Sequence, residues 1–216
     1  MDRRIARSTK ALKKALVELL EEKTIDEISV TEITERAGYT RKTFYSRYED
    51  KSAFITAIID DEAVEIMRVS ELVFPEEDNA VQFEEQRILA DAKSFEHVLT
   101  NKELYRAIIR NKLAGNALHL LTKKIKEKSY DLYSGIIADQ LYDMPYAKSP
   151  IDWDIVFYIK AALIVNLISY WDEVDYKYSP SYMAEQKSNA NGKLIIKKYD
   201  LLRKADNVKK QRRNKK

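Results

Sequence analysis

The stretch TEITERAGYTRKTFYSRYEDK, residues 31–51, decides the fold of the N-terminal part of this chain. Two short polar segments of helical composition meet in it at Gly38. Glycine adopts a left-handed backbone at little cost, so Gly38 suits the end of one helix and the turn into the next. At about 100° per residue, Phe44 and Tyr48 share one side of the second helix, and Lys42 lies nearly opposite them. The second helix therefore has a narrow apolar edge and a broad face of hydrogen-bond donors.

Capping residues mark where these two helices begin. Ser29 and Glu32 have the spacing of a capping box, in which each side chain satisfies a backbone N–H of the other residue, and this predicts a helix over 30–37. Thr40 suits the N-cap of a helix over 41–48. Two short helices joined by a three- to four-residue glycine turn indicate a helix-turn-helix unit, whose second helix can enter the major groove of DNA.

The rest of the chain predicts further helices. The sequence has 216 residues, 45% of them hydrophobic, with only four Gly and four Pro, which favours helices with short connections over sheets. The predicted fold class is therefore all-α, a three-helix unit followed by a helical bundle. The other helices are expected at 3–22, 51–73, 80–98, 102–111, 116–139, 151–173 and 180–203.

Composition excludes several kinds of site. There is no Cys, and the two histidines, His97 and His119, are far apart, so neither a metal site nor a cofactor is expected. No Gly-rich phosphate loop and no nucleophile motif is present, so the protein is not expected to be an enzyme. The acidic stretches 60–62 and 172–175 are interpreted as solvated helix surface and loop.

One apolar stretch, residues 151–171, could be mistaken for a membrane span. Asp152, Asp154 and Lys160 interrupt it, and a span needs about 20 predominantly apolar residues. We therefore expect no membrane association and a cytoplasmic location. Sixteen of these 21 residues are apolar or aromatic, which predicts a helix that must be buried on every side. A homodimer formed through residues 151–203 is the simplest way to bury it.

The first 60 or so residues resemble the TetR family of transcriptional regulators. The family pattern A-G-[aliphatic]-[ST]-x-x-[ST]-[aliphatic/aromatic]-Y-x-x-F-x-x-K is matched by Ala37, Gly38, Thr40, Thr43, Phe44, Tyr45 and Lys51. Tyr39, Arg47 and Tyr48 depart from it, at positions where a small aliphatic residue, His or Tyr, and Phe are usual. These departures leave the operator sequence open. Residues 167–185 are similar to the junction of the last two helices in several TetR-like proteins, which pair with their copies as a four-helix bundle.

The resemblance implies two kinds of DNA contact. Contacts to backbone phosphates are implied for Thr31, Thr40, Tyr45 and Lys51. Contacts to base edges in the groove are implied for Arg41, Lys42, Thr43 and Ser46. The helical arrangement of residues 41–48 independently places Lys42, Thr43, Tyr45 and Ser46 on the exposed side or its flanks.

From these observations we expect three parts: a DNA-binding domain (1–51), an effector-binding and dimerisation domain (52–203) and a basic, disordered tail (204–216). The last fourteen residues carry eight Lys or Arg against one Asp, so non-specific contact of the tail with DNA is an alternative to a merely solvated tail. The expected function is a repressor that binds a pseudo-palindromic operator as a homodimer and is released by a small molecule, whose binding residues stay unassigned. A co-activator or a nucleoid-associated protein with the same fold is the alternative.

Overall fold

The computed structural model of the protein describes residues 3–69, 80–110, 113, 116–140 and 152–190, and these residues form helices and connecting turns only. The predicted all-α fold class is confirmed over them. The helices are α1 (Arg3–Glu22), α2 (Val30–Ala37), α3 (Arg41–Tyr45), α4 (Lys51–Val69), α5 (Ala80–Thr100), α6 (Lys102–Ile109), α7 (Ala117–Gln140), α8 (Trp153–Glu173) and α9 (Pro180–Ser188).

The predicted helix bounds are right for α1 and α2, and α3 is shorter than predicted. α3 ends at Tyr45 rather than at residue 48, because Ser46 caps it and the N–H groups of Arg47 and Tyr48 both turn back to the Phe44 carbonyl, at 3.0 and 3.1 Å. The later part of the helix predicted over 180–203, and the basic tail over 204–216, lie outside the described residues.

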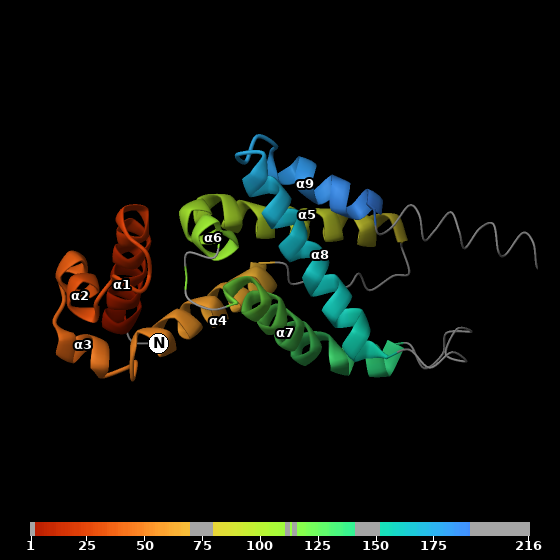
Figure 1. The fold of residues 1–216 in the computed structure, drawn as a ribbon. Helices are drawn as coiled ribbons and strands as arrows, with labels where there is room; N and C mark the ends of the chain where they lie inside the picture. The colour runs from red at the N-terminus through yellow and green to blue at the C-terminus, as the bar shows by residue number, and fades with distance from the viewer. Residues whose placement is uncertain (1–2, 70–79, 111–112, 114–115, 141–151, 191–216) are drawn as a thin grey trace, which may run out of the picture.

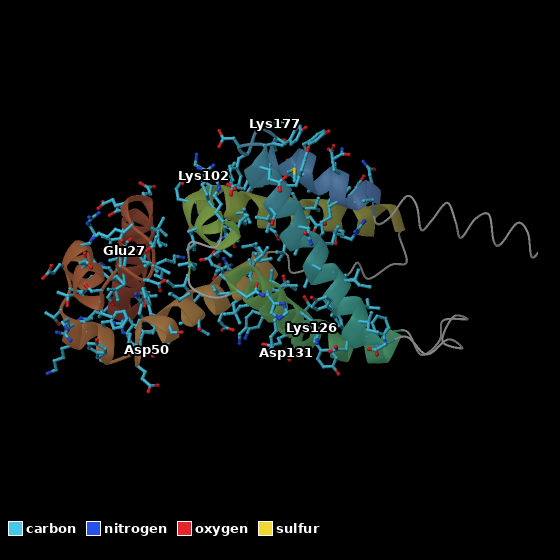
Figure 2. The ribbon with its side chains drawn as sticks, in the orientation of Figure 1. Glu27, Asp50, Lys102, Lys126, Asp131 and Lys177 are labelled. Carbon is cyan, nitrogen blue, oxygen red and sulfur yellow. The ribbon has the colours of Figure 1, made fainter. Side chains whose placement is uncertain are left out.

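The helices form two groups. Figure 1 shows α1, α2 and α3 together at one side, and α4 running from them toward a larger group made of α5 to α9. Within the larger group α5 packs against α9, and α7 packs against both α4 and α8. We call α1–α3 the reading head. In Figure 2, Asp50 marks the start of α4 beside the reading head, and Lys177 marks the turn between α8 and α9 in the larger group.

Each group has its own aromatic centre. In the reading head Phe44 is fully buried, and its ring lies 5.3 Å from those of Tyr48 and Phe54. Because Phe54 belongs to α4, this cluster fixes the reading head to the start of the connecting helix. In the larger group the fully buried Trp171 lies 5.5 Å from the Phe95 ring and 5.2 Å from that of Tyr176.

The acidic stretches 60–62 and 172–175 were interpreted as solvated, and this is wrong for one carboxylate in each. Glu62 and Asp172 are only 1% and 3% exposed. Asp172 accepts hydrogen bonds from Arg106 Nε at 2.8 Å and Arg110 Nε at 3.0 Å, which ties the end of α8 to α6. A buried carboxylate needs such partners, because desolvation otherwise makes its charge too costly. Glu62 has partners of the same kind, described below.

Helix α8 is not buried on every side within one chain, so its predicted burial depends on the predicted homodimer. Its inner side packs against α6 and α7, whereas Ile155, Tyr158 and Ile159 on the other side are 56%, 44% and 60% exposed. Among the described helices, only α8 is long and apolar enough to cross a membrane by length and composition. A single chain provides helices against only one side of α8. We call its open side, with Ile155, Tyr158, Ile159 and Tyr170, the outer face of α8.

Candidate nucleic-acid interface

The turn between α2 and α3 has the geometry that its sequence predicted. The Ser29 hydroxyl accepts from the Glu32 N–H at 3.2 Å, and the Glu32 carboxylate accepts from the Ser29 N–H at 2.8 Å, so the capping box is confirmed. Gly38 has φ +71°, in the left-handed region, and the N–H of Tyr39 donates to the Thr34 carbonyl at 2.8 Å. A Cβ on Gly38 would meet nothing within 4 Å. Glycine is therefore favoured here by the left-handed backbone conformation, and not by a steric clash that a side chain would cause.

The same local chemistry starts α3. Thr40 is extended (φ −94°, ψ 156°), and its hydroxyl accepts from the Thr43 N–H at 3.2 Å, as an N-cap residue does. Phe44 then enters the aromatic cluster and anchors the inner side of the helix. The helix has only five residues. A helix this short does not hold its own direction in water, so its orientation depends on the contacts at its two ends and on Phe44.

Five of the eight predicted site residues gather on the exposed side of α3 and its caps: Thr40, Arg41, Lys42, Tyr45 and Ser46. The Arg41 guanidinium lies over the Tyr45 ring, 5.7 Å from its centroid, and Tyr45 is 46% exposed. Thr43 is half-buried, and its hydroxyl lies 3.1 Å from that of Thr40. Thr31 is half-buried in the first turn of α2.

The positive charge of this surface is not neutralised by the described part of the chain. Arg41 and Lys42 are exposed and take part in none of the salt bridges between described residues. By contrast, Lys23 after α1 and Arg36 of α2 meet acids. Lys23 pairs with Glu32, and its hydrogen bond, helped by those from Ser29, lowers the pKa of Glu32 to about 2. Arg36 pairs with Glu22 at 3.0 Å and lowers the pKa of that carboxyl. Arg7 and Lys10 on α1 are also exposed and take part in no salt bridge between described residues, so the uncompensated cations of the reading head lie on α3 and on α1.

Lys51 lies away from the exposed side of α3. Its ammonium donates to the carbonyls of Ile25 and Ile28, at 2.5 and 2.6 Å, and so holds the loop between α1 and α2 against the start of α4. A lysine has three N–H donors, so one stays available for another acceptor. Both carbonyls lie more than twenty residues before Lys51, so no local sequence pattern predicts this arrangement.

Arg47 is a second residue whose position the sequence did not reveal. Its guanidinium donates to the hydroxyls of Ser8 and Thr9 and to the carbonyl of Ile5, all on α1. The side chain therefore runs from the end of α3 to the first turns of α1.

A buried charged cluster joins the reading head to the larger group. Lys13 of α1 donates to Glu62 of α4 at 2.6 Å, and His97 Nε2 of α5 lies 2.8 Å from the other oxygen of Glu62. Burial opposes ionisation of Glu62, but the hydrogen bonds and charges of His97 and Lys13 together leave its pKa below its ordinary value. The phenol of Tyr105 on α6 is buried nearby, and its burial raises its pKa well above the ordinary value.

These features define a helix-turn-helix protein with a cationic recognition helix and a further helical domain. Among the described residues, no group of side chains could hold a metal ion. Residues 12–58 match the family profile described as "Bacterial regulatory proteins, tetR family", and residues 92–190 match the one described as "Transcriptional regulator C-terminal region". The chain belongs to the TetR family of transcriptional regulators, which are DNA-binding proteins and not enzymes.

Solved structures share the fold at low sequence identity. A TetR-family regulator from Syntrophomonas wolfei is 15% identical with a TM-score of 0.64, over 88% of this chain and 95% of that one. The regulator FadR from Bacillus subtilis, solved in complex with stearoyl-CoA, is 20% identical with a TM-score of 0.58, over 83% and 95%. The dihydroxyacetone kinase operon activator DhaS is 18% identical with a TM-score of 0.55, over 85% and 93%. No curated protein matches this chain.

Proposed function

We propose that the protein is a repressor that binds a pseudo-palindromic operator as a homodimer and is released by a small molecule. The observation that carries the proposal is the exposed side of α3, where Arg41 and Lys42 have no acidic partner among the described residues. The major groove admits one helix, and its guanine edges offer acceptors that Arg and Lys side chains can reach. The reading head belongs to residues 1–51 and the remaining helices to an effector and dimerisation domain over 52–203.

Within this proposal the site residues divide between bases and phosphates. Those that point away from Phe44, or flank it, read base edges: Arg41, Lys42, Thr43 and Ser46. Those at the edges of the reading head hold phosphates: Thr31, Thr40, Tyr45 and Lys51. Lys51 does so with the one ammonium N–H that the Ile25 and Ile28 carbonyls leave over.

The outer face of α8 supports the homodimer. A row of large apolar side chains along a helix is costly to leave in water, and a second copy of the same helix offers a matching apolar row. Two reading heads related by a two-fold axis would meet two half-sites about 34 Å apart on one face of the duplex. A protein of this kind acts where the chromosome is, in the cytoplasm.

An effector is supported by a relative of the same fold, since the FadR of Bacillus subtilis was solved in complex with stearoyl-CoA. A second candidate function, activation, is supported by the likeness to DhaS, which is an operon activator. A reporter gene placed behind the bound site separates the two, because deleting the protein raises expression under repression and lowers it under activation.

The experiment that tests the proposal is selection of duplexes from a random library by the purified protein, followed by affinity measurements on single-base variants. Lys42→Ala should relax the preference at one position in each half-site, since a good base contact discriminates by about 1–3 kcal/mol. Lys123→Ala is the matched control, because Lys123 is also an exposed helix lysine but lies on α7, in the larger group. Recovery of no consensus by the wild type would contradict the proposal.

A further inference from the structure

The side chain of Arg47 reaches three acceptors on α1. Nη2 donates to Ser8 Oγ at 2.6 Å, and Nη1 donates to Thr9 Oγ1 at 3.1 Å and to the Ile5 carbonyl at 3.3 Å. These partners precede Arg47 by 38 to 42 residues, so the contacts connect two helices that are distant along the chain. Arg47 itself is half-buried and takes part in no salt bridge among the described residues.

The hydrogen bonds of Ser8 leave its hydroxyl oxygen oriented to accept from Arg47. Ser8 is only 1% exposed, and its hydroxyl proton is directed to the carbonyls of Arg4 and Ile5, at 2.9 and 3.0 Å. A hydroxyl has one donor and two acceptor positions, so its lone pairs remain for a cation. Arg47 supplies that cation. A buried hydroxyl that is oriented by two carbonyls and accepts from a guanidinium is a defined partner and not a chance surface contact.

Besides Arg47, the aromatic packing of Tyr48 against Phe44 and Phe54 holds the end of α3. The helix has five residues, and its start is fixed by the Gly38 turn and the Thr40 cap. At its far end, one further polar contact reaches α1: the Tyr48 hydroxyl lies 3.5 Å from Thr9 Oγ1. A hydrogen bond of this length is weak. Among the described residues, the Arg47 guanidinium therefore makes the strongest polar contact between the end of α3 and α1.

We infer that Arg47 is a positioning residue for DNA reading: it sets the angle at which α3 is presented, by tying the end of α3 to Ser8, Thr9 and Ile5 of α1, and it does not act as a phosphate contact. This inference rests on the proposed function, because it concerns how the same recognition helix meets its operator. The angle determines whether all base contacts of α3 form together, so losing the tether lowers operator affinity more than affinity for random DNA.

The charge-conserving variant Arg47→Lys separates the two roles. A lysine keeps the positive charge but presents a single ammonium and cannot hold two hydroxyls and a carbonyl in the same fork. For a positioning residue, Arg47→Lys and Arg47→Ala should both lower operator affinity about tenfold, the equivalent of one lost base contact, and leave random-DNA affinity and the salt slope near those of the wild type. For a phosphate contact, Arg47→Lys should bind like the wild type, and Arg47→Ala should weaken all duplexes alike and reduce the salt slope by about one per subunit.

Changes on α1 test the same inference from the other side. Ser8→Ala removes the acceptor of Nη2, and Thr9→Val removes one of the two acceptors of Nη1 while keeping the side-chain shape. Each should lower operator affinity in the wild-type background and have little further effect in Arg47→Ala, because the tether is already absent there. If Ser8→Ala does not fold, because Ser8 is buried, Thr9→Val alone provides the test.

The measurements are affinities of the full chain for the selected operator and for a random duplex at several salt concentrations, with circular dichroism to confirm folding. The inference would be overturned if Arg47→Lys bound the operator with wild-type affinity. It would also be overturned if the affinity losses of the α1 variants added fully to the loss in Arg47→Ala. A wild type that selects no sequence would instead refute the proposed function, so the two failures are distinct.

Discussion

Replacing Glu62 by Gln removes the negative charge at the centre of the cluster that joins the reading head to the larger group. Glu62 is 1% exposed, whereas its partners Lys13 and His97 keep 25% and 17% of their side chains exposed. Breaking a buried ion pair by changing one partner costs about 3–5 kcal/mol when the other charge is stranded. Because Lys13 can still reach water, we expect a loss below this range, about 2–3 kcal/mol of the free energy of unfolding.

The assay is urea unfolding of the wild type, Glu62→Gln, Lys13→Met and the double variant, followed by circular dichroism. Lys13→Met keeps the length of the side chain and removes its charge. The four stabilities give a coupling energy between Lys13 and Glu62, expected at about 1–2 kcal/mol. Lys14→Met is the matched control, because Lys14 is 79% exposed and pairs only loosely with Glu18, at 3.6 Å. A Glu62→Gln variant as stable as the wild type, or a coupling energy of zero, would refute this account of the cluster.

Three further predictions concern the turn, the outer face of α8 and the acidic limit of stability. Gly38→Ala should destabilise the protein by about 1–2 kcal/mol in urea unfolding, because the left-handed backbone penalises a Cβ, and Gly38→Asn should cost less; an Ala variant as stable as the wild type would contradict this. Ile159→Asp should give a monomer in light scattering, whereas Val64→Asp, at another exposed apolar position, should not; a wild type that is already monomeric would exclude the proposed interface. The Glu32 carboxyl, with an ordinary pKa of 4.5 that falls to about 2 on folding, stabilises the fold above pH 4.5 and loses that effect as the pH falls toward 2. Glu32→Gln should therefore lose less stability than the wild type over that interval.

Local sequence patterns predicted the reading head well, because the interactions that define it are local. The Ser29 capping box, the Gly38 turn and the Thr40 cap each involve residues within five positions of one another. Their side-chain chemistry is therefore visible in a short stretch of sequence. The length of α3 was overestimated, since its apolar edge continues to Tyr48 while its backbone turns at Ser46.

The arrangement of charged side chains could not be predicted in the same way. The sequence implied a phosphate contact for Lys51 and no role for Arg47, and the partners of these two side chains, on α1 and on the loop after it, are 23 to 42 residues away. Glu62 was read as solvated because its neighbours are acidic, and only the packing of three helices shows that it is buried. What covers α8 could not be predicted for a related reason: apolar composition indicates that a helix needs cover, and does not say whether that cover comes from the same chain.

The measurement that tests the central claim most directly is hydroxyl-radical footprinting of the full chain on the duplex that it selects. Two recognition helices of a homodimer should protect two windows whose centres lie about one helical turn apart on one face of the DNA and are related by a dyad. Arg41→Ala with Lys42→Ala should abolish both windows together, whereas Lys123→Ala should leave both intact. A single protected window, or protection that is unchanged in the α3 double variant, would contradict the account.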